Sequence, residues 1–469
     1  MSKKKLLLIC LSLVLFLLTF YIHVDNTAQL ELNKNELIFR QKLLGKQSQL
    51  IENNLRDKNL PIVFKKLDNS PDIISSEVGN KKNKYIRQIS NFFLTNKKGE
   101  KIVNFKKKIQ FSKYRTEDIL TSITGSYGGT FYIDTTDENL FLLTVTGIFA
   151  YTNLNEIKEN KINFNQLPSN IEIFKTKSNL YNKRGDSFRD IFIYKEKIYI
   201  SYIREVNKNC FNTSILVADI NLKKLNFKKF FSPDACINID NEDKDFNMYQ
   251  SGGRITYYKN NKLLFSIGDY RYRKHAQDQN SIFGKIISID IDTQDYKIIS
   301  LGHRNPQGIT YDKKNDIIYM SEHGPKGGDE INININPNEK TRNYGWAISS
   351  YGEHYEKKIN EDKYKKYPLH KSHEKYGFIE PLIYYKKSIG FSEILIPAPG
   401  FFSNEKNQIL VSSLRKKSLY FYELNSEFKI KSESVVYIGD RIRDIIYVKK
   451  LDIFILSMED TTSIGILSK

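Results

Sequence analysis

The sequence predicts an all-β protein, a six-bladed β-propeller preceded by an N-terminal membrane anchor or signal segment and a partly helical linker. Short runs rich in β-branched and aromatic residues recur from residue 115 to the end, each bounded by Gly, Asn, Asp or Lys. Several of these runs pair around a polar turn, as expected of hairpins. No long amphipathic pattern interrupts them, so the sequence predicts successive β-meanders, as in a propeller.

The N-terminal segment sets the expected compartment. MSKKK precedes the apolar stretch LLLICLSLVLFLLTFYI at 6–22, which is at the short end for a membrane span. The basic flank favours a cytoplasmic N-terminus and an exported remainder. No clear cleavage site follows, so residues 1–26 are expected to be a signal anchor or a removed signal peptide. The rest would lie at the periplasmic face of the inner membrane or free in the periplasm.

Residues 27–114 are expected to be a linker and an N-terminal extension whose role the sequence leaves open. Leu and Ile recur at rough helical spacing in the linker, and residues 61–114 are rich in Lys. The propeller would then occupy 115–469, which is long enough for six blades of about 60 residues each. Hairpins are predicted at 191–203, 254–268, 308–322 and 443–458.

The charge distribution and the cysteine content bear on nucleic-acid binding and on disulfide formation. The chain has 73 Lys and Arg residues against 54 Asp and Glu residues, a net charge of +19. The Lys residues are scattered along the whole chain and form no basic stripe, so no nucleic-acid partner is expected. Cys210 and Cys236 are the pair outside the apolar segment, and an oxidising compartment favours a disulfide between them. Two buried free thiols are the alternative.

Five polar loops fall at the ends of predicted strands, where a propeller binds its ligands. They are GHRNPQG (302–308), SEHGPKGGDEINI (321–333), GDYRYRKHAQDQNSIFGKI (268–286), SSLRKKSL (412–419) and GDRIRDI (439–445). In the first, Pro306 stiffens the loop and Arg304 offers a planar fork that suits a carboxylate. In the second, the paired glycines free backbone carbonyls, which suit Ca²⁺. Each loop has a plain alternative, a solvated turn whose charged side chains are already satisfied.

The Arg-Ile-Arg motif at 441–443 brings two positive charges close together. Period-2 alternation places Arg441 and Arg443 on one face of an extended segment. Two neighbouring guanidinium groups repel each other unless an anion lies between them. Pairing with Asp440 and Asp444 is the alternative to a ligand.

In this order, the loops resemble the signature segments of the soluble PQQ-dependent aldose sugar dehydrogenases (glucose/sorbosone dehydrogenase-like proteins). The resemblance also includes NYGW at 343–346 and covers about 190–460. It implies a six-bladed propeller that holds pyrroloquinoline quinone (PQQ) and Ca²⁺ at its central mouth. It also implies oxidation of an aldose sugar at the C1 hydroxyl, with hydride passed to the quinone. Electrons would then go to an external quinone or cytochrome.

The family's site residues carry over onto matching positions of this chain. The resemblance implies cofactor contacts by Arg304, Asn305, Gln307, His323, Asp329, Arg415, Arg441 and Arg443. Arg415 stands where the family has Lys. The carbonyls of Gly324 and Pro325 would hold Ca²⁺, and Asp269 and Arg304 would assist catalysis.

One position departs from the family. The family's general base is a His before a Gly-Arg strand start, and here the segment reads MYQSGGR, 248–254. Counting back from Arg254 places Gln250 at the His position, whereas aligning on Gln-Ser-Gly places Tyr249 there. Gln is not a base near pH 7, and Tyr would need its pKa of about 10 lowered far. His275 or His323 would have to stand in.

Three functions therefore stay open from the sequence. The first is a PQQ-dependent sugar dehydrogenase, with PQQ and Ca²⁺ as cofactors. The second is a propeller that binds PQQ or another anionic or sugar ligand without oxidising it. The third is a Ca²⁺-dependent propeller hydrolase such as a lactonase, which would need a central ring of acidic residues.

Overall fold

The computed structural model describes residues 61–66, 101–105, 107–116, 129–158, 161–175, 188–355 and 361–469. The chain divides into two units, and all described residues belong to the second, Ser48–Asp72 with Asn96–Lys469. The apolar segment 6–22 and the helical part of the linker lie outside the described residues. Within the described ranges, no helix is long and apolar enough to cross a membrane.

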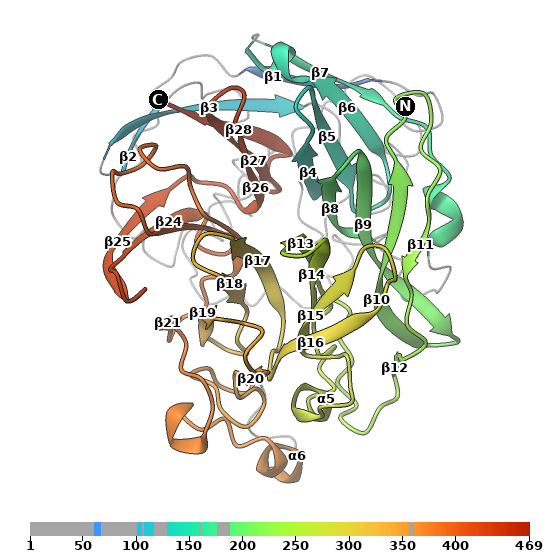
Figure 1. Cartoon of the computed structure of the whole chain (residues 1–469), viewed down its shortest axis with the longest axis vertical. Helices are drawn as coiled ribbons and strands as arrows, with labels where there is room; N and C mark the ends of the chain where they lie inside the picture. The colour runs from blue at the N-terminus through green and yellow to red at the C-terminus, as the bar shows by residue number, and fades with distance from the viewer. Residues whose placement is uncertain are drawn as a thin grey trace, which may run out of the picture. The chain divides into compact units, whose positions relative to one another are not determined.

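Four sheets of this unit are built from consecutive strands (Figure 1). One contains β8 (Phe188–Tyr194), β9 (Lys197–Asn207), β10 (Cys210–Asp219), β11 (Lys228–Phe231) and β12 (Ile237–Asn238). The next contains β13 (Gly252–Tyr258), β14 (Lys262–Ile267), β15 (Lys285–Asp290), β16 (Tyr296–Leu301) and β20 (Arg342–Asn343). The third contains β17 (Pro306–Asp312), β18 (Ile317–Glu322), β19 (Asp329–Ile335) and β21 (Ile383–Tyr385). The fourth contains β22 (Phe391–Leu395), β23 (Gln408–Ser413), β24 (Ser418–Leu424) and β25 (Ile430–Tyr437).

The fifth sheet joins both ends of the described chain. Its strands run in the order β26, β27, β28, β3, β1, β7, β6, β5, β4, and β2 pairs with β3 at the side. Their bounds are β1 (Ile62–Lys66), β2 (Lys101–Asn104), β3 (Lys108–Thr116), β4 (Phe131–Thr135), β5 (Asn139–Thr144), β6 (Phe149–Asn153), β7 (Lys161–Gln166), β26 (Ile442–Val448), β27 (Ile453–Met458) and β28 (Ser463–Ser468). The two end strands, β26 and β4, also contact each other, so this sheet is nearly closed.

Six strands line the centre of the unit, namely β4, β8, β13, β17, β22 and β26. Each of them contacts the next, and β26 contacts β4, which closes the ring. In Figure 1 the sheets follow one another around this ring in the order of the colour bar. The predicted all-β class is confirmed, and each of the four predicted hairpins forms the first two strands of a sheet.

The N-terminal strands correct the expected domain boundary. The boundary at 114 falls inside β3, which pairs with the C-terminal strand β28 through Tyr114 opposite Ile464. Strand β1 then bridges β3 and β7, where Phe64 lies opposite Thr116 on one side and Ile162 on the other. Strands from the extension whose role was left open therefore belong to this sheet. The partner of β3 lies more than 300 residues away, so no local pattern reveals it.

A buried serine recurs in the second strands of the sheets. The hydroxyls of Ser201, Ser266, Ser321 and Ser457 each donate to a backbone carbonyl of the next inner strand, at 2.5, 3.2, 2.9 and 2.6 Å. All four side chains are buried, so the carbonyl also satisfies a hydroxyl that water does not reach. These bonds hold neighbouring inner strands together and thereby fix the ends of the loops between them.

Helices are few and short in the described part of the chain. They are α5 (Lys274–Gln277), α6 (Glu361–Lys366) and the 3₁₀ turns η2 (Leu154–Lys158), η3 (Ile171–Phe174) and η4 (Glu374–Tyr376). Only α5 lies within one of the predicted ligand loops.

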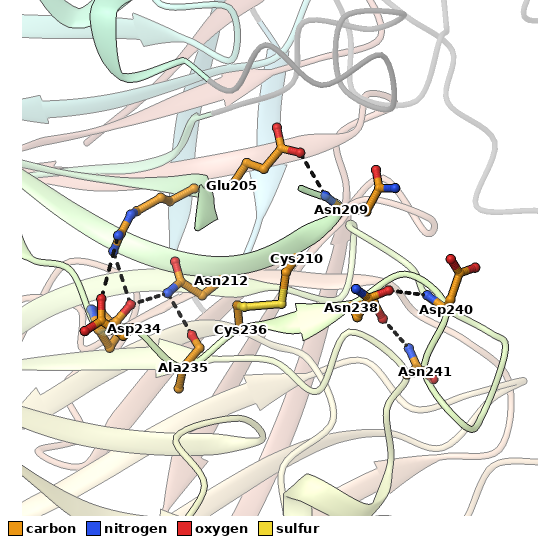
Figure 2. Close-up of a disulfide and its surroundings, with 12 residues drawn as sticks. Glu205, Asn209, Cys210, Asn212, Asp234, Ala235, Cys236, Asn238, Asp240 and Asn241 are labelled. Carbon is orange, nitrogen blue, oxygen red and sulfur yellow. Dashed lines mark hydrogen bonds and ion pairs between the residues drawn. A yellow bond between two sulfur atoms is a disulfide. The ribbon is translucent and has the colours of Figure 1, made fainter. Parts of the chain in front are cut away.

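The predicted disulfide is present. Cys210 opens β10 and bonds to Cys236, just before β12, with 5.4 Å between the two Cα atoms (Figure 2). Beside it, the side-chain amide of Asn212 donates to the carbonyl oxygens of Pro233 and Ala235 at 2.6 and 2.9 Å. The bridge and these bonds hold the 233–236 loop against β10.

Candidate active site

The predicted loops meet where the inner strands begin. The Gln250 loop leads into β13, the Arg304 loop into β17, and the Arg441 loop into β26. Side chains tie these starts together, since Asn305 Oδ1 accepts a bond from Gly252 N at 3.2 Å. Because the inner strands contact one another in a ring, their first residues form one shared mouth.

Arg304 occupies the middle of one side of this mouth. Its guanidinium donates to the carbonyls of His323 and Gly324 at 2.9 and 2.7 Å, and it lies 5.4 Å from the ring centre of Trp346. Burial lowers the pKa of Arg304, and the nearby carboxylate of Asp269 opposes that effect. Arg304 is thus held in place by neutral groups, and its charge remains available to an anion.

Asp269 is fully buried behind Arg304. Trp346 Nε1 donates to its Oδ2 at 2.7 Å, and Arg271 N donates to its Oδ1 at 2.8 Å. Burial raises the pKa of Asp269, while Arg304 and these two hydrogen bonds lower it. Both oxygens of Asp269 are engaged, so this carboxylate holds Trp346 and the backbone of Arg271 in place beside Arg304.

Asn305 and Gln307 connect this side to the Arg-Ile-Arg motif. Gln307 Nε2 donates to Asn305 Oδ1 at 3.0 Å, and Arg443 reaches Gln307 Oε1 at 3.5 Å. Arg441 and Arg443 hold the same carboxylate, Glu459, through their Nε atoms at 2.6 and 2.9 Å. The two arginines are thus prearranged side by side on one buried anion.

Glu459, and neither of the two aspartates named as alternatives, pairs with both arginines. Asp440 instead accepts from Lys113 at 3.0 Å, and Asp444 contacts Arg254 at 3.0 Å. Burial opposes the charge of Glu459, but Arg443 and Arg441 lower its pKa to about 2. Tertiary packing decides this partner, and sequence proximity to the arginines gave no hint of it.

Asp329 ties two loops together instead of facing the open mouth. Its Oδ1 accepts from Gly324 N at 3.0 Å, and its Oδ2 accepts from the backbone nitrogens of Ile389 and Gly390 at 2.7 and 2.6 Å. Arg415 N in turn donates to Ile389 O at 3.1 Å, and the Arg415 side chain is exposed. This carboxylate therefore sets the distance between the Gly324 loop and the exposed cation of Arg415.

The Gly324–Pro325 segment needs glycine for packing. A Cβ at Gly324 would lie 2.1 Å from the carbonyl oxygen of Gly328, which no side chain tolerates. The carbonyl of Gly324 faces Arg304, and that of Pro325 accepts from the hydroxyl of Tyr355 at 3.0 Å. A guanidinium and a phenol thus take the two carbonyls that were expected to bind Ca²⁺.

This arrangement does not fit a cation at Gly324 and Pro325. A divalent ion there would compete with Arg304 for the same oxygen and would be repelled by its charge. Across the part of the chain that the structure describes, no three His, Cys, Asp or Glu side chains are grouped to hold a metal. The Ca²⁺ site at Gly324 and Pro325 stays a prediction, and in this arrangement of the loops Arg304 and Tyr355 take its two carbonyls.

The position of the missing histidine is filled by a buried amide. Gln250 is 5 % exposed, and its Oε1 has no hydrogen-bond partner in the described structure. Tyr249, the other alignment, packs its ring against the hydrophobic cluster that contains Tyr132 and Phe188. Of the two positions, Gln250 is the one with an unused polar atom.

The two histidines expected as substitutes lie in different surroundings. His275 packs against Tyr272 and Phe283, with ring centres 4.7 and 5.6 Å away, and burial lowers its pKa. His323 lies at the start of the Gly324 loop, where its Nε2 bonds to the carbonyl of Phe391 and burial lowers its pKa. His323 therefore belongs to the mouth and His275 to its packed wall.

A small cleft opens beside Arg304 and reaches two buried acid–histidine pairs. His303 Nδ1 lies 3.4 Å from Glu322, and His373 Nε2 lies 3.5 Å from Glu330. Both glutamates, His373, Arg304 and Trp346 line the cleft. The sequence had given these pairs no role, although EHGPKGGDE contains both glutamates.

Deeper in the ring, one arginine contacts all the inner strands. Arg254 lies 2.8, 2.9 and 3.0 Å from the carboxylates of Asp190, Glu393 and Asp444. It also donates to Gln307 O at 2.8 Å and lies 5.3 Å from the ring of Tyr132. The centre thus has an acidic group, as a lactonase would need, but a guanidinium already occupies it.

The chain is similar in sequence to known sugar dehydrogenases. A model of the Glucose / Sorbosone dehydrogenase family matches residues 187–466. The chain is 29% identical over 209 residues to the aldose sugar dehydrogenase YliI of Escherichia coli K12, covering 41% of this chain and 53% of that protein. It is 27% identical over 124 residues to quinoprotein glucose dehydrogenase B of Acinetobacter calcoaceticus, covering 20% and 25%. The chain spans about half the length of the first of these relatives.

Solved structures share the fold. A crystal structure of glucose dehydrogenase aligns with a TM-score of 0.58 at 18% identity, over 72% of this chain and 96% of that one. The apo aldose sugar dehydrogenase of Escherichia coli gives 0.55 at 19% identity, over 72% and 95%. The PQQ-bound aldose sugar dehydrogenase of Streptomyces coelicolor gives 0.51 at 16% identity, over 76% and 98%. These likenesses place the ring of sheets among propeller-type folds.

Proposed function

Because the chain belongs to the glucose/sorbosone dehydrogenase family, we propose that it is a PQQ-dependent dehydrogenase that oxidises an aldose sugar at its C1 hydroxyl. One observation carries the proposal: three cationic side chains, Arg304, Arg441 and Arg443, lie around a mouth lined by the amides of Asn305 and Gln307. The closed ring of six inner strands supports a six-bladed propeller as the scaffold.

The cationic mouth fits an anionic, planar cofactor. PQQ is a flat tricarboxylate, and several fixed guanidinium groups match its charge and its bidentate oxygens. Arg441 and Arg443 are both held by Glu459 before any ligand arrives, so little ordering is needed on binding. When bound, PQQ supplies the two-electron acceptor for the sugar.

This chain's own residues would bind and orient both partners. Arg304, buried against Trp346, would direct its charge toward an oxyanion, because protein carbonyls and not carboxylates hold it. Asp329 would keep the Gly324 loop and the Arg415 loop at a fixed separation. No step is assigned to Ca²⁺, because Arg304 and Tyr355 take the carbonyls that would bind it.

A second function rests on Gln250. A buried amide stands where the family has its base, and losing a general base costs on the order of 10²–10⁴ in rate. The chain would then hold PQQ or another anionic ligand without efficient oxidation. The hydrolase alternative has less support, since Arg254 already neutralises the central carboxylates.

The compartment is part of the proposal. MSKKK followed by the apolar segment 6–22 favours export, with the chain anchored at the periplasmic face of the inner membrane or released into the periplasm. The Cys210–Cys236 bond suits an oxidising compartment. The electron acceptor would be a membrane quinone or a periplasmic cytochrome.

An absorbance titration tests the function. The full chain, purified in mild detergent, is mixed with PQQ and Ca²⁺, freed of unbound cofactor and then given a panel of aldoses. Bound quinone that becomes reduced with a sugar supports the dehydrogenase. Bound quinone that stays oxidised with every aldose supports the binding function. A chain that retains no quinone contradicts the cofactor assignment.

A further inference from the structure

Arg189 carries a buried charge that the described structure leaves unmatched. It is the second residue of β8 and is 6 % exposed. Its Nε donates to Ser251 Oγ at 3.2 Å. Both of its terminal nitrogens are buried and have no hydrogen-bond partner in the described structure. The two terminal nitrogens of a guanidinium group can together donate two hydrogen bonds to one carboxylate.

The other buried arginines of the ring show what is missing. Arg254 contacts three carboxylates, and Arg443 contacts Glu459. An isolated buried charge is costly, and a buried polar group without a partner calls for an explanation such as an absent ligand. Arg189 therefore differs from Arg254 and Arg443 in lacking an anion, and from Arg304 in lacking any partner for its terminal nitrogens.

The backbone makes room for this side chain. Gly253 has φ +117, and a Cβ there would lie 2.6 Å from Cβ of Arg189. Most residue types are thus excluded opposite Arg189. Arg189 is consequently built into the start of β8 and does not merely lie on its surface.

Arg189 belongs to the same mouth as the predicted site. Its partner Ser251 directly follows Gln250, whose Oε1 is a buried acceptor without a partner. The phenol of Tyr132 lies within electrostatic reach of Arg443, Arg189 and Arg254; burial raises its pKa, and the three cations lower it. Unused donors and an unused acceptor thus lie on either side of Ser251.

We propose that Arg189 binds a carboxylate of the ligand in the mouth, and that Gln250 accepts a hydrogen bond from a hydroxyl of that ligand. A sugar acid carries both groups, so the substrate class would be an aldose with a carboxylate, such as a uronic acid. A carboxylate of the cofactor is the other source of the same chemistry. The proposal rests on the proposed function, because it assigns the ligand of that site.

Calorimetry without cofactor tests the sugar acid directly. D-glucuronate and D-glucose are matched probes that differ in the carboxylate. The full-length chain is expected to bind glucuronate more tightly than glucose. Arg189→Met should weaken the affinity for glucuronate on the order of 10- to 100-fold and leave the affinity for glucose unchanged. Arg189→Lys, which keeps the charge but not the fork, should fall between them.

Titration with PQQ alone, followed by the fluorescence of Trp346, tests the other source. If Arg189→Met weakens PQQ and not glucuronate, the carboxylate belongs to the cofactor, and the role of Arg189 still holds. If the wild-type chain does not bind PQQ, the proposed function fails. The calorimetry with glucuronate still tests the role of Arg189, because it uses no cofactor. The proposal for Arg189 is overturned if the Met variant binds glucuronate and PQQ with wild-type affinity.

Thermal unfolding separates ligand binding from a structural role. Without ligand, Arg189→Met should match or exceed the wild-type midpoint, because an unmatched buried charge is removed. Arg443→Met is the control, since it leaves Glu459 buried without one of its cations and should lower the midpoint. A midpoint for Arg189→Met as low as that of Arg443→Met would mean that Arg189 holds the fold together, and would overturn the proposal.

Discussion

The indole Nε1 of Trp346 donates a hydrogen bond of 2.7 Å to Oδ2 of the buried Asp269. The guanidinium of Arg304 lies 5.4 Å from the centre of the same indole ring. Trp346 is the single tryptophan of the chain, so its emission reports on this side of the mouth alone. The contact therefore supplies both a structural tie and an internal probe.

Quenching of Trp346 should measure binding of the anionic cofactor. PQQ absorbs near the indole emission, so its binding should quench the signal. Arg415→Gln removes an exposed cation of the mouth and should weaken PQQ on the order of 10-fold. Lys416→Gln, the adjacent exposed residue of equal charge, is the control and should leave the titration curve unchanged. Identical curves for both variants would remove Arg415 from the site.

Replacing Trp346 with Phe should cost stability in a pH-dependent way. The variant keeps the aromatic packing but leaves Asp269 without one donor, a loss of about 1–3 kcal/mol. That hydrogen bond lowers the pKa of Asp269, so its loss should raise this pKa further. The cost should be larger at pH 8 than at pH 5, because the lost hydrogen bond favours the charged form of the carboxyl group. Urea unfolding at both pH values tests this, and an equal cost at both would contradict it.

The Arg254 cluster should make the protein less stable at alkaline pH. Burial raises the pKa of Asp190 to about 7, Asp444 adds to the rise, and Arg254 opposes it. A raised carboxyl pKa gives stability that is present at low pH and lost as the pH rises through the folded value. The unfolding midpoint should therefore fall as the pH rises from about 4 to about 7.

Glu393 provides the matched variant for this pH dependence. Burial raises its pKa well above the usual value, although Arg254 opposes the shift. Glu393→Gln mimics the protonated form, so it should cost little at low pH and make the decline with rising pH less steep. Arg254→Met leaves Asp190 and Asp444 buried without their cation and should cost about 3–5 kcal/mol. If Glu393→Gln costs as much as Arg254→Met, Glu393 acts as a charged partner of Arg254, and this account of the pH dependence is wrong.

Replacing both cysteines of the disulfide should lower the free energy of unfolding. Cys210 and Cys236 are 26 positions apart, and a loop of that size predicts a loss of about 3–4 kcal/mol when Cys210 and Cys236 are both changed to Ser. The comparison is urea unfolding of wild type and variant, each with and without a reducing agent. The reductant should lower only the wild-type midpoint. Equal sensitivity of both proteins would place the effect elsewhere.

Local patterns predicted the fold class because they record burial in strands. The hairpin at 308–322 alternates around a polar turn, and it forms β17 and β18. A serine also recurs in the second strand of four sheets, at Ser201, Ser266, Ser321 and Ser457. It is a repeat signal in the sequence, but one serine per sheet is easily missed where the repeats otherwise differ. The closure by β1 and β3 had no local signal, since these Lys-rich strands pair with strands far along the chain.

The site was predictable to the level of loops and not of partners. Glycine and arginine density identified the Arg304 and Arg441 loops, because such residues rarely serve a core. The anion between Arg441 and Arg443 proved to be Glu459, which lies on another strand end. Arg189 escaped notice because a single charge in SFRDIFIY resembles any half-exposed strand residue. Burial, which only the structure reveals, gives it meaning.

The base position offers the sharpest test of whether oxidation survives. Gln250→His places an imidazole where the buried Oε1 has no partner in the described structure. If the rest of the site is intact, sugar oxidation should rise by about 10²-fold or more, as expected when a general base is restored. Tyr249→His is the matched control: its ring packs in a hydrophobic cluster, so the change should lower stability without a gain in rate. Dye-linked rates on glucose and glucuronate, measured for both variants, distinguish the outcomes. A gain in the Tyr249 variant alone would move the base position by one residue, and no gain in either would favour a binding protein.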